Sequence, residues 1–445
     1  MPLRPKFEEF RRAADEGLSQ KVRSAGSTKV VQRKAALDRA FSDPAAARSH
    51  AAAVKDHVLA NLGPMLEEFE RHALSRGMEV VWATNAKEAN EAIERVCREA
   101  GPRGARVVKG KSMATEETGL NQFLEERGHH VVETDLGEFV VQLDGDHPSH
   151  IVTPIIHKDR HDSARALRRA GIAVPSDEPV AIAAAARSHL REEFARADVG
   201  VSGANFGIVE TGRIVIVENE GNNRLSTTAP RVHVVLMGIE KLLPAERDLA
   251  LFLPLLVGSA TGQHLTVYTH LVGGPKGQGE TDGPERVVVV LLDNGRSRVL
   301  HSPEREILRC LRCGACLNVC PVYREVSGHA YRHVYPGPLG AVLAPSLEGV
   351  EDYGDLAQAS TLCGACHEAC PVDIPIPDLL LGLRKQGTVQ GSWSAWRRLA
   401  ENDRIWRAAL RLVPMAQRVA PGWREVHGLL DDHGAKAKEG RRGRP

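Results

Sequence analysis

The sequence CLRCGACLNVCP, residues 310–321, places four cysteines at intervals of three, three and four residues and follows the last one with a proline. This C-x2-C-x2-C-x3-C-P spacing is typical of the bacterial iron–sulfur run, in which three cysteines hold one cluster and the fourth ligates its neighbour. A tight loop through Gly314 and Ala315 would wrap three thiolates around one corner of a cluster. Pro321 would stop helix formation beyond the last ligand.

A second motif, CGACHEACP at residues 363–371, repeats this spacing with Ser360 at the position of the first cysteine. Exchange of the last cysteine between the motifs predicts one complete [4Fe–4S] site, made of Cys310, Cys313, Cys316 and Cys370. The second cluster is then left with three thiolates, those of Cys320, Cys363 and Cys366. Its fourth position falls to Ser360, to solvent or to a partner, or else the cluster is [3Fe–4S].

Structural zinc is the alternative interpretation of these cysteines. Zinc sites typically use cysteine pairs separated by a longer loop, which is not the pattern here. Seven of the eight cysteines lie between Cys310 and Cys370, and such clustering favours a metal site over a disulfide scaffold. Cys97 stands apart on a predicted helix, where we expect a small buried hydrophobic residue.

The remaining composition is that of an ordinary globular protein. Hydrophobic residues make up 42% and charged residues 26% of 445 residues, enough for two to four domains. A net charge of +1 provides no field that would attract nucleic acid. The most apolar run, residues 249–258, is far shorter than the ~20 residues of a spanning helix. We therefore expect a cytoplasmic protein that is not an integral membrane protein and would reach a membrane only through partners.

Changes in residue composition and hydrophobic pattern divide the chain into four parts. Residues 1–74 predict a helical segment, with apolar residues at helical spacing, and residues 75–297 an α/β domain. Residues 298–387 combine short helices with the cysteines. Residues 388–445 contain an amphipathic helix at about 391–412 and a basic tail.

Several short apolar runs in the α/β part predict strands. Many are continuously apolar rather than alternating, which indicates a largely parallel sheet covered on both faces. The predicted strands are residues 79–83, 106–109, 130–133, 138–143, 199–202, 207–209, 213–217, 233–236 and 286–292. Helices are predicted at residues 87–100 and 115–127.

Polar side chains near the predicted strand ends suggest a ligand site. Asn205 and Glu210 lie where open parallel sheets bind ligands, and Arg224 would clamp a carboxylate in a small-acid pocket. The alternative is ordinary turn chemistry between buried strands. These three residues are the candidates for catalysis, whose identity otherwise stays unknown.

Two further groups of polar residues give weaker indications of a ligand site. Lys109, Lys111 and Ser112 follow a strand and would serve a phosphate site, although the glycine pattern of phosphate loops is missing. His157 and His161 have i,i+4 spacing, which favours a polar helix face over a metal site because no glutamate accompanies them.

Longer stretches of the chain resemble the lactate-utilisation protein B family, the iron–sulfur subunit of a three-protein bacterial system that oxidises L-lactate. The resemblance covers about residues 20–425. It is carried by residues 206–230, 293–296, 320–324, 328–331 and 335–341. In this family the second motif usually has three cysteines, so Ser360 is no departure, whereas the basic tail is particular to this chain.

The resemblance implies a LUD domain, similar in fold to an isomerase and CoA-transferase group, followed by an α-helical ferredoxin domain with two [4Fe–4S] clusters. It implies the ligand sets given above, and electron transport during oxidation of L-lactate to pyruvate. The implied partners are a cysteine-rich subunit and a smaller LUD-domain protein. Two alternatives stay open: an enzyme acting on a small hydroxy acid through an open cluster iron or the LUD pocket, and a redox sensor.

Overall fold

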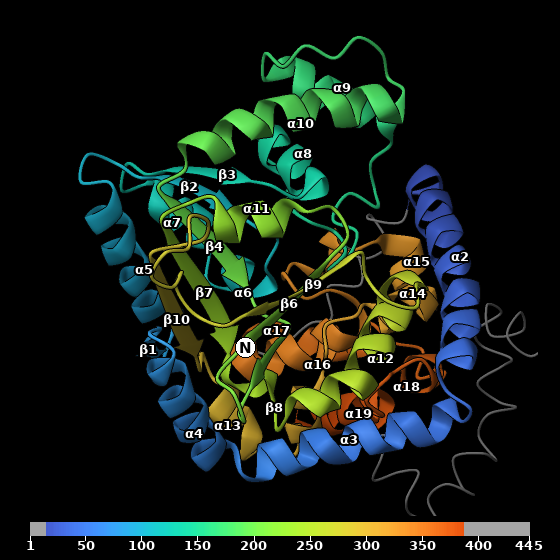
Figure 1. Cartoon of the computed structure of the whole chain (residues 1–445). Helices are drawn as coiled ribbons and strands as arrows, with labels where there is room; N and C mark the ends of the chain where they lie inside the picture. Colours follow the sequence, from blue (N-terminus) through green and yellow to red (C-terminus); the bar gives the residue numbers. More distant parts are fainter. Residues whose placement is uncertain (1–14, 387–445) are drawn as a thin grey trace, which may run out of the picture. The chain divides into compact units, whose positions relative to one another are not determined.

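The computed structural model describes residues 15–386, and this part begins with three helices (Figure 1). They are α2 (Glu16–Ala40), α3 (Pro44–Ala60) and α4 (Leu62–Ser75). The Asp43 carboxylate accepts the N–H groups of Ala45 and Ala46 and so begins α3. Helices are therefore present where helical spacing predicted them. The predicted helix at 391–412 and the basic tail lie outside the described residues.

The central element is a six-stranded sheet in which every pair of neighbours is parallel. In spatial order its strands are β1 (Glu79–Ala83), β10 (Arg286–Leu292), β7 (Val232–Gly238), β4 (Val199–Gly203), β2 (Arg106–Lys109) and β3 (His130–Glu133). Strands β1 and β10, which are the first and last described strands in sequence order, pair with each other, with Glu79 opposite Val288. The predicted parallel sheet is confirmed.

Eight helices surround this sheet or lie in its connections: α5 (Ala86–Ala100), α6 (Met113–Glu117), α7 (Leu120–Glu125), α8 (Leu136–Asp144), α9 (Arg160–Arg169), α10 (Pro179–Arg196), α11 (Asn222–Thr228) and α12 (Leu249–Thr261). Strand β10 shows how both faces are covered. Val288 and Val290 pack in a core with α5 and α7, whereas Val287 and Val289 pack in a core with α4. Burial on both faces explains the continuous apolar runs.

A second, smaller sheet was not predicted. Its order is β8 (Leu242–Leu243), β5 (Phe206–Ile208), β6 (Ile214–Glu218) and β9 (Tyr268–Val272). The β5–β6 and β6–β9 pairs are antiparallel, and the β5–β8 pair is parallel. Two short 3₁₀ helices, η1 (Ile239–Lys241) and η2 (Glu246–Asp248), flank β8.

The prediction of a strand at residues 138–143 was wrong, because this segment lies in α8. The Asp135 carboxylate accepts the N–H groups of Gly137 and Glu138, which caps the helix at its start. Phe139 and Val140 are buried on one face, with Leu136 and Leu143 packed against the same core. The valine pair resembled a strand, but the apolar residues at i, i+3, i+4 and i+7 follow the helical period.

The helix predicted at residues 115–127 is present as two pieces. The chain breaks between α6 and α7 at Gly119, which has a left-handed backbone with φ of 64°. Cys97 is fully buried on α5, as expected.

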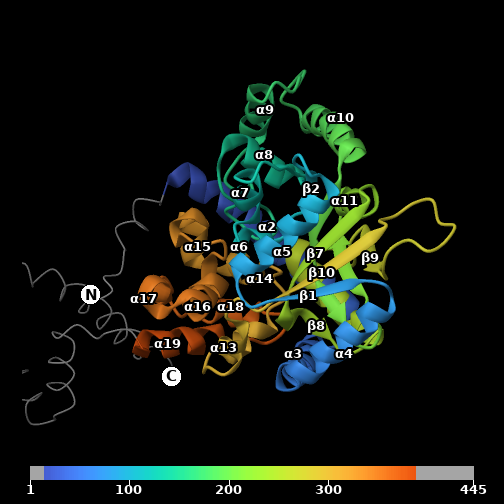
Figure 2. The ribbon, with the colours of Figure 1, turned by 90° about the vertical axis from the view of Figure 1, so that its left-hand side faces the viewer.

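The cysteine-rich part consists of short helices, and no strand occurs in the described residues after Leu292. Its helices are α13 (Arg296–Leu300), α14 (Ala315–Val319), α15 (Pro321–Val326), α16 (Gly337–Glu348), α17 (Val350–Tyr353), α18 (Ala365–Glu368) and α19 (Ile376–Gln386), with 3₁₀ helices η3 (Arg305–Arg309), η4 (His329–Tyr331) and η5 (Gly354–Gln358). Figure 2 shows these orange elements beside the green strands. Helix α2 packs against α12, α14 and α15, so one core joins the beginning of the chain to the cysteine motifs.

Candidate functional site

The first cysteine motif forms a loop between η3 and α14. Arg312 and Gly314 both have left-handed backbones, with φ values of 62° and 74°, and these two residues turn the loop. A Cβ at Gly314 would lie 2.9 Å from Cε1 of His150, so the close approach of His150 also requires glycine. The three thiols of this loop line one small cavity: Cys310, Cys313 and Cys316.

Cys370, from the second motif, lines the same cavity. Its Sγ accepts the backbone N–H of Ile374 at 3.4 Å, and Cys310 Sγ accepts the N–H of Arg312 at 3.3 Å. Hydrogen bonds to sulfur stabilise the anionic thiolate and tune the potential of a cluster bound to it. Four cysteines around one cavity fit the donor set that a [4Fe–4S] cluster requires.

The remaining three cysteines of the two motifs form a second group. Cys320 lies between α14 and α15, where its Sγ accepts the N–H of Tyr323 at 3.4 Å. Burial, followed by the charges of Cys320 and Cys363, raises the pKa of Cys366 to about 12, and the charge of Cys363 also acts on Cys320, so the three thiols lie near one another. Ser360 Oγ accepts the N–H of Leu362 at 3.1 Å, which turns the chain just before this group.

The pKa values of the thiols indicate that these groups of sulfurs require bound cations. Burial, followed by the charge of Cys310, raises the pKa of Cys313 to about 12. Burial likewise raises the pKa of Cys370 to about 11. Buried thiolates so close together are unfavourable unless cations offset them, and metal ions do so when they replace the protons. The donor set therefore fits iron–sulfur clusters.

Pro321 acts differently from the prediction. Helix α14 ends at Val319, and Pro321 then occupies the first turn of α15, with Cys320 as the capping residue. Proline is favourable there because its missing N–H would have no partner in the first turn of a helix. The proline thus begins a helix rather than preventing one.

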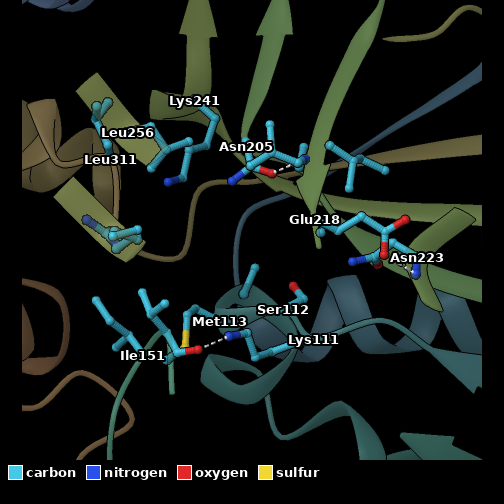
Figure 3. Close-up of a pocket in the computed structure, with 18 of the residues that line it drawn as sticks. Lys111, Ser112, Met113, Ile151, Asn205, Glu218, Asn223, Lys241, Leu256 and Leu311 are labelled. Atoms are coloured by element: carbon cyan, nitrogen blue, oxygen red, sulfur yellow. Dashed lines mark hydrogen bonds between the residues drawn. The ribbon is translucent and has the colours of Figure 1, made fainter. Parts of the chain in front are cut away.

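A cavity of about 270 Å³ opens at the carboxyl ends of β4 and β7 (Figure 3). Open parallel sheets bind ligands at this edge. Gly203 lines it from the end of β4, Asn205 from the turn before β5 and Lys241 from η1. Leu311 and Arg312 line it from the first cysteine loop. The cavity therefore lies directly against the loop that carries Cys310 and Cys313.

A buried charge network joins this cavity to the cysteine loop. Arg296 donates to Glu117 at 2.8 Å and to Glu240 at 2.7 Å. Arg312 approaches Glu240 at 3.3 Å, and its guanidinium stacks on the ring of Tyr335, whose hydroxyl donates to Glu117 at 2.6 Å. Burial alone would raise the pKa of Glu240, but Arg296 and Arg312 lower it to about 2. Glu240 therefore remains a carboxylate.

Comparison with known proteins identifies two domains in the chain. A LUD domain model matches residues 66–292, and a 4Fe-4S dicluster domain model matches residues 306–374. Lactate utilization protein B from Macrococcus caseolyticus is 46% identical over 340 residues, which cover 76% of this chain and 71% of that protein. The chain belongs to the lactate utilization protein B family.

Other members of the lactate utilization protein B family are about as similar. The Bacillus subtilis protein is 44% identical over 339 residues, covering 76% of this chain and 70% of its own length. An uncharacterized electron transport protein of Escherichia coli, YkgF, is 44% identical over 339 residues, covering 76% and 71%. A crystal structure of a DUF162 family protein from Deinococcus radiodurans matches 52% of this chain and 98% of its own, with 16% identity and a TM-score of 0.30, too low to support an argument.

In this member of the family the predicted polar residues fall in different places. Asn205 lines the cavity, and its Oδ1 accepts the N–H of Val217 at 2.9 Å. Glu210 is exposed between β5 and β6, where it accepts the N–H of Glu246. Arg224 is exposed on α11. Neither Glu210 nor Arg224, the expected carboxylate clamp, is therefore part of this cavity.

The residues predicted to form a phosphate site also lie in different places. Lys109 is fully buried and forms ion pairs with Glu133 at 2.7 Å and Glu116 at 3.1 Å, so its charge is already neutralised. Lys111 and Ser112 line the cavity instead. The Lys111 amine donates to the carbonyl oxygen of Val152 at 2.8 Å (Figure 3).

The two histidines do not share a helix face. His161 lies in α9, whereas His157 precedes that helix, and its Nε2 is 3.0 Å from the Asp146 carboxylate. Asp146, His157 and His329 bring three possible metal ligands within 4.8 Å of one another. Lys158 pairs with the same Asp146 carboxylate at 2.7 Å and so provides a cation there already.

Sequence reasoning missed two cationic residues of this lactate utilization protein B family member. Lys241 follows the carboxyl end of β7, so the rule that placed Asn205 would also have found it. Arg48 donates to the carbonyl oxygens of Cys370 at 2.7 Å and His367 at 2.9 Å, from a helix more than 300 residues away, and no local pattern indicates that contact. Within residues 15–386, no helix is both long and apolar enough to cross a membrane.

Proposed function

We propose that this chain is an iron–sulfur electron-transfer subunit in the oxidation of L-lactate to pyruvate, which would let a cell use lactate as a carbon source. The observation that carries the proposal is the crossing of the two motifs, because Cys370 lines the cavity of the first motif while Cys320 faces the second. The names of the relatives supply the lactate part of the proposal.

In this proposal Cys310, Cys313, Cys316 and Cys370 hold the first cluster. Cys320, Cys363 and Cys366 hold the second, whose fourth position falls to Ser360, to solvent or to a partner, or which is a [3Fe–4S] cluster. When bound, such clusters take up and release single electrons. The chain contributes the thiolates and the N–H groups directed at Cys310, Cys320 and Cys370. Five of the seven cysteines are buried, whereas Cys310 is half-buried and Cys363 is exposed.

The spacing of the ligands supports electron transfer between the two sites. Cys316 lies in α14 and Cys320 directly follows that helix, four residues further along the chain. Cys366 lies in α18 and Cys370 follows its end at the same sequence separation. Each pair thus contributes one ligand to each cluster and keeps the two clusters adjacent.

The proposal includes two partners, a cysteine-rich subunit and a smaller LUD-domain protein. A pair of one-electron sites in this chain would collect the two electrons of lactate oxidation and pass them on singly. A second candidate function places the oxidation of the hydroxy acid in this chain itself. The cavity that touches Leu311 and Arg312, beside the first cluster loop, favours that alternative.

The test begins with anaerobic purification of the full chain and measurement of its iron and acid-labile sulfide. EPR spectra are then recorded before and after addition of L-lactate, with and without the two partner proteins. About seven to eight irons, with reduction by lactate only when the partners are present, is the expected result. Reduction of the isolated chain by lactate would favour the second candidate, and zinc in place of iron would overturn both.

Cysteine variants test the ligand assignment. Cys316→Ser is expected to remove the signal of the four-thiolate cluster and Cys366→Ser the signal of the other. Cys97→Ser is the matched control, because Cys97 is buried on α5 and belongs to neither group. Retention of both signals in Cys316→Ser would contradict the assignment.

A further inference from the structure

The cavity beside the first cysteine loop has a cationic end formed by two parts of the chain. Lys241 contributes from η1, and Arg312 contributes from the loop between Cys310 and Cys313. Arg312 Nη1 is buried and has no hydrogen-bond partner. Within the described residues, no hydrogen bond or ion pair holds the Lys241 amine.

We propose that this cavity binds a small monocarboxylate, a 2-hydroxy or 2-oxo acid, with its carboxylate between Lys241 and Arg312. Arg312 Nη1 is a buried cationic donor without a partner, and Lys241 is a half-buried cation beside it that no ion pair among residues 15–386 holds, so an anion between them is favourable. Glu240 does not remove this need, because its carboxylate is shared with Arg296 and reaches Arg312 only through Nη2. An arginine paired with a lysine gives a carboxylate both directed hydrogen bonds and charge.

The walls next to this cationic end suit the rest of such an acid. Figure 3 shows the Lys241 amine and the side-chain amide of Asn205 directed towards the same open space, with Ser112 and Met113 across it. Because Asn205 Oδ1 already accepts the N–H of Val217, its NH₂ group is free to donate to the oxygen on C2. Leu256 and Leu311 offer apolar contact for a short alkyl group. The volume of about 270 Å³ restricts the ligand to a small molecule.

The opposite end of the cavity selects against a second carboxylate. Figure 3 shows Glu218 on the side away from Lys241, and Asp135 and Glu220 also line the cavity, where the charges of Asp135 and Glu218 act on Glu220. Glu218 is fixed as an acceptor by the N–H groups of Asn223 and Arg224, both at 2.8 Å. Like charges this close repel an anion, so a dicarboxylate that reached from Lys241 to this end would bind more weakly.

Only the choice of a 2-hydroxy or 2-oxo acid rests on the proposed function. The cation pair and the acidic end predict a monocarboxylate whether or not the chain transfers electrons. The position of Leu311 and Arg312 adds a second expectation: the ligand lies against the loop that carries the first cluster, so binding would perturb that cluster and leave the second unchanged.

The experiment uses the full chain with its clusters in place, under anaerobic conditions. L-Lactate, pyruvate, malate and inorganic phosphate are titrated in turn by calorimetry, and the EPR signal of each cluster is followed. Lactate and pyruvate are expected to bind at least tenfold more tightly than malate or phosphate and to shift one cluster signal. Lys241→Gln is expected to weaken binding of both acids at least tenfold.

Lys87→Gln is the matched control, since Lys87 is highly exposed on α5 and does not line the cavity. Iron content measured for each variant separates a lost ligand site from a lost fold. The proposal is overturned if lactate and pyruvate do not bind the fully loaded chain, if Lys241→Gln binds them as tightly as the parent does, or if malate binds equally well.

The two proposals fail separately. Reduction of the clusters by lactate with partners, but no binding of acids to this chain, would leave the proposed function standing and remove the cavity site. Binding of pyruvate that depends on Lys241, but no reduction by lactate with partners present, would remove the proposed function and leave the cavity site.

Discussion

Arg296 shows how single residues join the two domains. It lies just after the last strand of the LUD sheet, and its guanidinium binds Glu117 from α6 and Glu240 beyond β7. All three side chains are almost completely buried, with exposed fractions of 2%, 0% and 1%. The network ends at Arg312 in the cysteine loop, so the position of that loop depends on charges that lie inside the sheet domain.

Replacement of Arg296 by alanine should therefore destabilise the protein strongly. Two buried carboxylates would lose their main counter-ion, and breaking a buried pair from one side costs about 3–5 kcal/mol. The measurement is urea unfolding of the cluster-loaded chain, followed by circular dichroism. Arg231→Ala is the control, because the Arg231–Glu285 pair is exposed and its loss should leave the midpoint nearly unchanged.

His233 predicts how stability depends on pH. It is fully buried on β7, with Nε2 2.8 Å from the hydroxyl of Ser202, and burial lowers its pKa from 6.5 to about 3. Below pH 6.5 this histidine therefore binds a proton in the unfolded chain but not in the folded chain. The free energy of unfolding thus falls as the pH decreases below about 6.5. Between pH 7.5 and 5.5 the loss from this residue is about 1.4 kcal/mol.

The variant His233→Gln should show a correspondingly smaller loss of unfolding free energy over the same pH interval. His264→Gln, which changes an exposed histidine, should retain the dependence of the parent. Equal slopes for His233→Gln and the parent would show that another group causes the effect.

Among the elements, α11 packs unusually close to the sheet. A Cβ on Gly200 of β4 would lie 1.6 Å from the carbonyl oxygen of Ser226 in α11. Helix α11 also carries Asn222 and Asn223, which line the cavity. The close contact therefore fixes one wall of the cavity.

The variant Gly200→Ala should push α11 away and destabilise the fold by about 1–3 kcal/mol, the usual cost of overpacking. Gly63→Ala is the control, because Gly63 lies in α4 with no atom near its missing Cβ, and alanine favours helix there. Thermal unfolding should show a lower midpoint for the first variant and an equal or higher one for the second.

The predictability of the elements follows their local physics. The bounds of β1, β2 and β3 agree with the predicted strands, because each is a short run that contains two adjacent valines. Strand β9 was missed because its side chains are only partly buried and carry little apolar pattern. The error at α8 came from ignoring its capping residue Asp135.

The site was predictable to a similar, limited extent. Cysteine spacing indicated which thiols would meet, since the ligand geometry of a cluster constrains the chain. For the cavity, Asn205 was found but Glu210 and Arg224 were not part of it, because sequence cannot tell which residue of a loop faces inward. The place of Arg312 in the cavity could not be predicted from the sequence, since it arises from packing between distant segments of the chain.

At the scale of the whole molecule, the cysteine-rich part depends on its surroundings and on its clusters. Most of its helices have three to six residues, too short to be stable alone. Its core is shared with α2, α3 and α12. The parallel sheet, by contrast, has its own two cores on either face.

Removal of iron with a chelator should therefore loosen the cysteine-rich part first. Hydrogen exchange followed by mass spectrometry should show faster exchange in peptides from residues 306–374 and little change in β7 and β10, which lie in the middle of the sheet. Uniform loss of protection across both parts would contradict this expectation. Restoring iron and sulfide should return the original pattern.

The contact of Arg48 with the carbonyl oxygen of Cys370 bears on how the protein is made. These two residues are 322 positions apart, and β1 likewise needs β10 as its neighbour. Helices α2 and α3 are synthesised before the cysteine motifs against which they pack. These contacts can therefore form only late, and a cluster held by Cys310, Cys313, Cys316 and Cys370 would be inserted only after synthesis has passed Cys370.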